Sequence, residues 1–254
     1  MSDVRITMRG HVGIAEICRA PNNYSDMDLI RDLASAFESL DENPDVRCIV
    51  LGAEGKNFCA GANFASPARN TVGDRQTGHL YQHAVRLFRC QTPVVAAVQG
   101  AAVGGGLGLS LVGDFRVADT NSRFTANFNR LGFHPGFGIS VTLPRVVGQQ
   151  MAAMLLYTGR RIDGAEAHRI GLVDVLAPVG EVREAALALA GEIALSAPIA
   201  VASTRATLRR GLADAIAEVT DHELSEQQKH FETEDFKEGV KAMAERRPPA
   251  FAGR

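Results

Sequence analysis

The sequence predicts an α/β protein whose core of largely parallel strands is followed by a helical C-terminal region. Apolar runs of strand length alternate with amphipathic helical stretches in the N-terminal half, and from about residue 138 the pattern turns helical. The composition is that of a globular protein, with 254 residues, 46% of them hydrophobic and 22% charged. A chain of this length buries about 70–75% of its unfolded surface, so disordered, collagen-like and mini-protein classes are excluded.

Strands and helices alternate in the first half of the chain. The segments 4–8 and 12–17 alternate on either side of Gly10 and His11, which predicts a β-hairpin. A capping-box pattern at 25–28 begins an amphipathic helix that Asn43 and Pro44 end. The elements expected next are a buried strand at 48–53, a helix at 77–90, a strand at 93–98, a helix beginning within the glycines at 104–106 and a strand at 115–119.

The second half of the chain reads as a succession of helices. Only VDVLAP (173–178) interrupts them as a strand. We therefore expect one α/β core over residues 1–200 and a helical region over 201–254 that packs against a partner. The helices are expected at 138–147, 149–158, 163–170, 181–195, 199–210, 212–230 and 235–246.

Charge and hydropathy exclude two classes of partner. Lys and Arg number 27 against 29 Asp and Glu, so no basic excess points to nucleic acid. Residues 90–113 carry no charge and are long enough for a membrane span, but six of them are glycines. The segment therefore fits a buried strand and a turn, and we expect neither a nucleic-acid nor a membrane partner.

The cysteines and the N-terminus indicate a cytoplasmic protein. The four cysteines are too far apart for a CxxC pair, and a chain of this length needs no disulfide framework. Asp3, Arg5 and Arg9 precede any apolar run, so we expect no signal peptide.

Two glycine-rich turns each follow a buried strand, GKNFCAGANF (55–64) and GAAVGGGLG (100–108). Glycine lets a backbone approach a ligand closely and leaves its N–H groups exposed. The second turn also begins a helix, whose free N–H groups favour negative charge. Two such N–H groups aimed at one oxygen form an oxyanion hole. Tight packing turns have the same composition, whereas a dinucleotide fingerprint does not fit because Leu109 stands in place of its third glycine.

In their order and spacing, the two turns resemble the crotonase (enoyl-CoA hydratase/isomerase) superfamily, and the resemblance runs along nearly the whole chain. It implies a spiral of ββα units followed by a helical trimerisation region, and a homotrimer or a dimer of trimers. The segments that carry it are RAPNN (19–23), FCAGANF (58–64), PVVAAVQGAAVGGGLGLSLVGD (93–114), residues 131–145, TGRRIDGAEAHRIGLVDVL (158–176) and DFKEGVKAMAERRPPAF (235–251).

The resemblance also implies a ligand and its binding residues. The substrate would be an acyl-CoA thioester whose carbonyl oxygen accepts hydrogen bonds from the backbone N–H groups of Ala62 and Gly105. Ala60 would contact the adenine. Coenzyme A would enter as part of the substrate, with no permanently bound cofactor and no metal. The residues implied to flank the nucleotide end are Arg19 and, from a neighbouring subunit, Arg247 or Phe251.

The chain departs from the pattern of the family's hydratases, which use two glutamates to handle a water and a proton. The first of these positions is Gly108, and the second falls close to Phe128. The position at which some isomerases and dehalogenases of the family carry an acid is Gly136, and the usual Asp of the first loop is Asn63. The sequence therefore predicts an atypical member that lacks both hydratase glutamates.

Few acids remain in this part of the chain, and His134 is the candidate for proton transfer. Between residues 75 and 162 the only acids are Asp114 and Asp119. His134 lies between glycines in GFHPGFG (132–138), where a histidine can act as acid or base near neutral pH. A solvent-facing loop histidine fits the same position equally well.

Three functions follow from these observations. The first is an enzyme of fatty acid or aromatic acid metabolism that stabilises a thioester enolate or oxyanion, whether for hydration, isomerisation or another lyase or hydrolase step. The second is a non-catalytic acyl-CoA binding protein. The third is an ordinary hydratase whose acid comes from elsewhere, such as Glu54 or a neighbouring subunit. Since one fold hosts many reactions, the fold alone does not choose among them.

Overall fold

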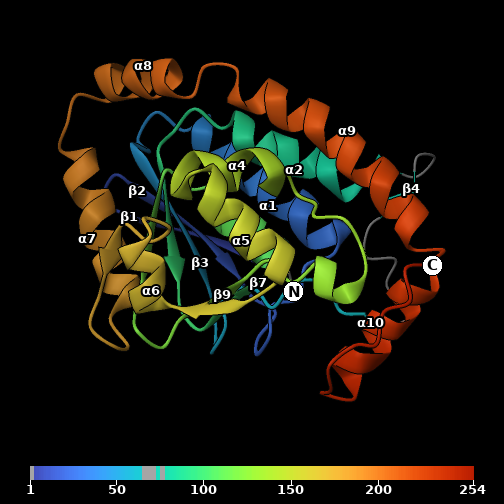
Figure 1. Cartoon of the computed structure of the whole chain (residues 1–254). Helices are drawn as coiled ribbons and strands as arrows, with labels where there is room; N and C mark the ends of the chain where they lie inside the picture. The colour runs from blue at the N-terminus through green and yellow to red at the C-terminus, as the bar shows by residue number, and fades with distance from the viewer. Residues whose placement is uncertain (1–2, 65–72, 75–77) are drawn as a thin grey trace.

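The computed structural model describes residues 3–64, 73–74 and 78–254, and it confirms an α/β core followed by helices (Figure 1). The main sheet has the strand order β1-β2-β3-β6-β8-β11. The first pair is antiparallel and forms the expected hairpin, and every later pair is parallel. The strands are β1 Val4–Arg9, β2 Val12–Ile17, β3 Cys48–Ala53, β6 Val94–Val98, β8 Phe115–Ala118 and β11 Val175–Leu176.

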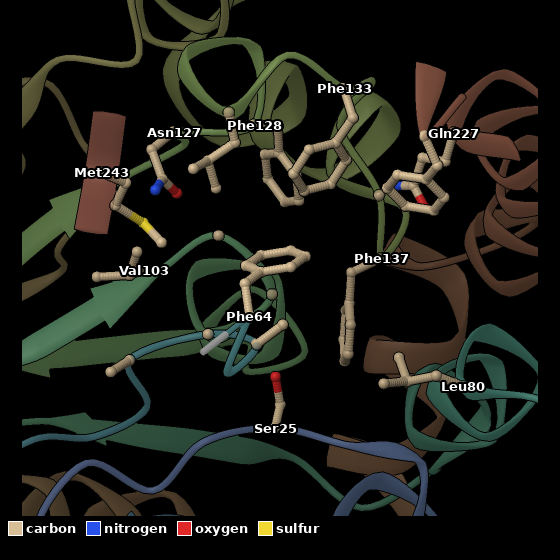
Figure 2. A pocket seen from close by; sticks show the side chains of 18 of the residues that line it. Ser25, Phe64, Leu80, Val103, Asn127, Phe128, Phe133, Phe137, Gln227 and Met243 are labelled. Atoms are coloured by element: carbon tan, nitrogen blue, oxygen red, sulfur yellow. The ribbon is translucent and has the colours of Figure 1, made fainter. Parts of the chain in front are cut away.

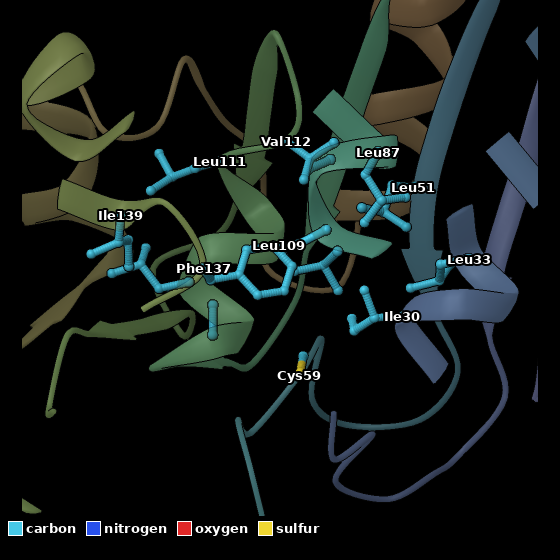
Figure 3. Packing of buried hydrophobic residues seen from close by; sticks show 14 of the residues in the cluster. Ile30, Leu33, Leu51, Cys59, Leu87, Leu109, Leu111, Val112, Phe137 and Ile139 are labelled. Atoms are coloured by element: carbon cyan, nitrogen blue, oxygen red, sulfur yellow. The ribbon is translucent and has the colours of Figure 1, made fainter. Parts of the chain in front are cut away.

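Helices cover both faces of this sheet, which is why β3 and β6 are unbroken apolar runs. On one face lie α1 (Met27–Asp41) and α2 (Leu80–Arg89), and on the other lies α7 (Val182–Ala194). Asp26 caps α1 by accepting a hydrogen bond from the N–H of Leu29 at 2.9 Å. Figure 3 shows side chains of α1, α2, α3 and β3 that belong to one buried cluster.

A second, three-stranded sheet of order β10-β9-β7 departs from the expectation. The sequence predicted a single strand after residue 138, and this was wrong because β10 (Arg161–Asp163) is also a strand. The other two strands of this sheet, β9 (Arg123–Thr125) and β7 (Ala101–Val103), were not predicted either. Strands of three residues are too short to show a hydrophobic period. A two-stranded ladder joins β4 (Gly73–Asp74) to β5 (Gly78–His79), so α2 begins three residues later than expected, and the expected start at 77 lies outside the described residues.

The predicted helices of the second half are all present. In Figure 1, α9 runs past α2 and α4, while α10 lies at the end of the chain. The division at residue 200 and the role of the last helices in assembly stay predictions. The helices are α3 Gly105–Ser110, the short η1 Asn129–Leu131, α4 Ile139–Val147, α5 Gln149–Thr158, α6 Gly164–Arg169, α8 Pro198–Leu208, α9 Leu212–His230 and α10 Glu234–Ala244.

The helix α8 and the turn before it carry apolar side chains that are exposed to solvent. Leu195, Ile199 and Leu208 are exposed by 87%, 86% and 72%. Over the described ranges no single helix is both long and apolar enough to cross a membrane, and α7 with α8 passes that test only as a pair bent by 107°.

Candidate active site

The two glycine-rich turns lie against each other. The N–H of Cys59 donates to the carbonyl of Ala101 at 2.9 Å, and the N–H of Val103 donates to the carbonyl of Cys59 at 3.0 Å. The first turn therefore runs beside β7 like a further strand. This pairing brings residues 60–62 next to the N-terminus of α3.

Two glycines make this close approach possible. A Cβ at Gly106 would lie 2.1 Å from the carbonyl oxygen of Cys59, far inside van der Waals contact. Gly61 has φ +81°, and a Cβ there would lie 2.7 Å from the carbonyl oxygen of Val103. Any other residue at these positions would separate the two turns.

The pairing leaves two N–H groups free at the wall of one cavity, those of Ala62 and Gly105. Within the described part of the chain, neither of them donates to an acceptor. Gly105 is the first residue of α3, so its N–H has no partner inside the helix and lies at the positive end of the helix dipole. Both residues line the cavity. The structure thus brings the two predicted donors together, and their contact with a thioester stays a prediction.

The cavity is largely aromatic (Figure 2). It has an empty volume of about 730 Å³ including its mouth, within the usual range for small-molecule sites. Sequence reasoning missed this aromatic lining. The signal available was the density of phenylalanine, with four of the chain's twelve at positions 124, 128, 133 and 137. The phenylalanines that line the cavity are Phe64, Phe128, Phe133, Phe137 and Phe231.

Only neutral polar side chains reach the cavity from the described residues, namely Ser25, Tyr81, Asn127 and Gln227. The hydroxyl of Tyr81 donates to Oε1 of Gln227, and Nε2 of Gln227 donates to the carbonyl of His134, each at 2.9 Å. Burial raises the pKa of Tyr81 well above its usual value, so the phenol stays protonated. These groups can donate and accept hydrogen bonds, but none of them is a base at neutral pH.

Neighbouring rings fill the positions at which the resemblance places carboxylates. A Cβ at Gly108 would lie 2.8–2.9 Å from the Cβ, Cγ and Cδ1 atoms of Phe137. A Cβ at Gly136 would lie 1.7 Å from the hydroxyl oxygen of Tyr81. Phe128 itself lines the cavity. Phe137 reaches its position with φ +68°, a left-handed backbone that a phenylalanine rarely adopts.

His134 does not belong to the cavity lining that the described residues form. Its ring lies against those of His222 and His230, with centroids 5.7 and 6.4 Å away. The ring Nδ1 of His134 lies 2.8 Å from the carbonyl oxygen of Pro135, and the backbone N–H of His134 donates to Nδ1 of His230 at 3.2 Å. A role for His134 in proton transfer stays a prediction.

The residues predicted to hold coenzyme A lie in three different environments. Ala60 lines the cavity. Arg19 is mostly buried, and its guanidinium pairs with the carboxylates of Asp3 and Asp26. Phe251 is 43% exposed near the C-terminus and lines a separate hollow. Their contact with a nucleotide stays a prediction.

Comparisons with known proteins agree with this fold. Residues 10–254 match the family described as enoyl-CoA hydratase/isomerase. A crotonyl-CoA hydratase of Syntrophomonas wolfei is 34% identical over 232 residues, covering 90% of this chain and 89% of that protein. A short-chain-enoyl-CoA hydratase of Clostridium acetobutylicum is 32% identical over 251 residues, covering 97% and 96%. The crystal structure of a carnitinyl-CoA hydratase from Mycobacterium avium covers all of both chains with a TM-score of 0.89 at 28% identity. The resemblance seen in the sequence is thereby confirmed, and the chain belongs to the enoyl-CoA hydratase/isomerase family.

Proposed function

We propose that this chain is an acyl-CoA enzyme that binds the thioester carbonyl between the N–H groups of Ala62 and Gly105. The observation that carries the proposal is the pair of free N–H groups at the wall of an apolar cavity. Negative charge that develops on the carbonyl oxygen, in an enolate or a tetrahedral oxyanion, is stabilised there. Each preorganised donor of this kind lowers the barrier by about 2.7–4 kcal/mol.

The reaction proceeds without the pair of glutamates used by the family's hydratases. Support comes from the described cavity lining, which contains no Asp or Glu, and from the rings that occupy the space at Gly108 and Gly136. His134 or a bound water would then carry the proton. The reaction is hydration, double-bond isomerisation or another lyase or hydrolase step.

Replacing His134 by alanine tests the first of these proton carriers. We expect turnover to fall at least 100-fold while acyl-CoA binding survives, in line with general acid–base contributions of about 10²–10⁴. Unchanged turnover in the variant would assign the proton to water.

The experiment that tests the function is incubation with a panel of acyl-CoA esters, followed by chromatography and mass spectrometry. The panel contains saturated, α,β-unsaturated, aromatic and branched acyl groups, and the proposal expects at least one to be converted. A second candidate is a non-catalytic acyl-CoA binding protein, favoured by the neutral lining of the described cavity. In that case esters bind and none is converted.

An ordinary hydratase with a displaced acid is the third candidate, and crotonyl-CoA tests it. Rapid hydration of this ester by the pure protein would favour it. Glu54, the acid suggested within the chain, is paired with Arg5 and does not line the cavity.

We further propose a homotrimer or a dimer of trimers, with residues 201–254 contributing to the interface. The exposed apolar side chain of Leu208 in this region, with those of Leu195 and Ile199 just before it, supports burial against another subunit. Light scattering at micromolar concentration tests this, and a monomer would contradict it. Arg19, Ala60 and Phe251 are proposed to contact coenzyme A, and Ala60 has the best support because it lines the cavity.

The remaining proposals concern the protein's location and its need for cofactors, metals and nucleic acid. We propose a cytoplasmic protein with no permanent cofactor, no metal and no nucleic-acid partner. One group of described residues, Glu16, Cys18 and Glu54, has the spacing of metal ligands. Its carboxylates pair with Arg5 and Arg183, which favours a structural role.

A further inference from the structure

We infer that the acyl group accepted by this cavity is flat and uncharged, an aryl group that lies between Phe137 and a cluster of phenylalanine rings opposite. The inference rests on the proposed function, because it takes the thioester carbonyl to lie at Ala62 and Gly105. The phenylalanine cluster consists of Phe64, Phe128, Phe133, Phe231 and Phe236.

Four rings of the phenylalanine cluster form one wall, and Phe236 contacts three of them without lining the cavity. The rings come from well-separated segments of the chain and meet mostly edge to face. The centroids of Phe64 and Phe133 are 5.6 Å apart at 66°, and those of Phe133 and Phe128 are 5.5 Å apart at 81°. Phe133 also contacts Phe231 and Phe236 at 5.4 and 5.7 Å. Edge-to-face contact is a favoured geometry for aromatic pairs, so the rings stabilise one another's positions.

Phe137 forms the opposite wall. Figure 2 shows its ring across the open space from Phe64, with Leu80 beside it. Its place is fixed because it is only 1% exposed and packs on Gly108. Gly108 follows Gly105 by three residues, so it lies one turn along the same side of α3. A ligand whose carbonyl oxygen is held at Gly105 therefore has its next carbons beside the ring of Phe137.

The lack of charge among the described lining residues indicates that the acyl group is uncharged. None of the described lining residues is charged. A carboxylate or ammonium on the acyl group would lose its hydration without gaining a charged partner among these described residues. A flat π-system loses no such hydration and adds ring contacts on both sides. Each aromatic pair improves affinity by about 2- to 13-fold beyond the area that it buries.

Dissociation constants for four probes test the inference: benzoyl-CoA, cyclohexanecarbonyl-CoA, succinyl-CoA and acetyl-CoA, with free coenzyme A as the reference. The first two have the same carbon skeleton, and only the first is flat. We expect benzoyl-CoA to bind about 5-fold or more tightly than cyclohexanecarbonyl-CoA, and succinyl-CoA to bind more weakly than either. Equal affinities for the first two, or the tightest binding for succinyl-CoA, would overturn the inference.

Two matched variants test whether the ring of Phe137 causes the preference for benzoyl-CoA over cyclohexanecarbonyl-CoA. Phe137→Leu should lower the benzoyl to cyclohexanecarbonyl affinity ratio by about 2- to 13-fold, because one aromatic pair is lost. Phe37→Leu is the control, since Phe37 is a buried phenylalanine of α1 outside the cavity lining, and the ratio should stay at its wild-type value. A wild-type ratio in Phe137→Leu would remove Phe137 from the inference.

The acetyl-CoA probe separates two kinds of failure. If acetyl-CoA binds no more tightly than free coenzyme A and no other ester does, the proposed function itself fails. If acetyl-CoA binds more tightly but the flat and non-flat probes are equal, only the acyl-group inference fails.

Discussion

Replacing Gly105 by proline removes one hydrogen-bond donor from the cavity with little harm to the fold. Gly105 is the first residue of α3, and proline is well tolerated at that position because the N–H it lacks has no partner inside the helix. Gly105→Ala is the matched control, since it adds a Cβ and keeps the N–H. That Cβ would meet only the hydroxyl oxygen of Ser25, at 3.4 Å.

The readout is the affinity for an acyl-CoA thioester relative to its thioether analogue, which lacks the carbonyl oxygen. A hydrogen bond contributes about 0.5–1.5 kcal/mol net, so the two donors together give the wild type a preference of about 5- to 150-fold for the thioester. Gly105→Pro should reduce that preference by about 2- to 13-fold, and a converted ester should react about 10²–10³-fold more slowly. Isothermal titration measures the affinities, and thermal unfolding checks that both variants fold. A wild-type preference in Gly105→Pro, or an equal loss in Gly105→Ala, would refute the assignment of this donor.

Three further predictions concern stability. Gly108→Ala forces a Cβ against Phe137 and should cost about 1–3 kcal/mol in a urea melt. The same change in a Phe137→Gly background should cost nothing, because the side chain that the Cβ would meet is gone. Burial raises the pKa of the Glu223 carboxyl from 4.5 to about 7, so the folded chain binds the extra proton between these values and stability falls as the pH rises through them. In Glu223→Gln this loss of stability between the two pH values should be absent. The free energy of unfolding, measured at pH 5 and pH 8 for the variant and the wild type, checks this. Gly191→Ala, in open space on α7, should add up to about 1 kcal/mol and raise the melting temperature by about 2–4 °C, and an unchanged temperature would contradict it.

The fold was largely predictable because its long elements carry strong periodic patterns. The strand at 48–53 and the helix with its apolar face from Leu29 to Leu40 are both present. The three-stranded sheet was not predictable in the same way. Its strands are three residues long, and one of them, Ala101–Val103, lies inside a glycine-rich turn. Pairing with β9 and with the first turn, rather than local propensity, makes it a strand.

The candidate site was predictable only where it is built from backbone groups. Ala62 and Gly105 follow from two local motifs, and their N–H groups need no particular side chain. The aromatic lining depends on tertiary contacts, as when Phe64 meets Phe133 and Phe236. Nothing near Gly108 in the sequence indicates that Phe137 fills the space above it. Contacts of this kind between distant segments have no local pattern.

The shared volume of Gly108 and Phe137 has a consequence for how this protein can evolve. An acid at residue 108 alone would collide with the ring, and loss of the ring alone would leave a cavity that costs about 3–5 kcal/mol. Each single change therefore lowers the stability of the fold, and an acid at residue 108 requires a smaller residue at 137 as well. The two positions are therefore coupled, so the glycine at 108 and the ring at 137 are expected to change together rather than one at a time.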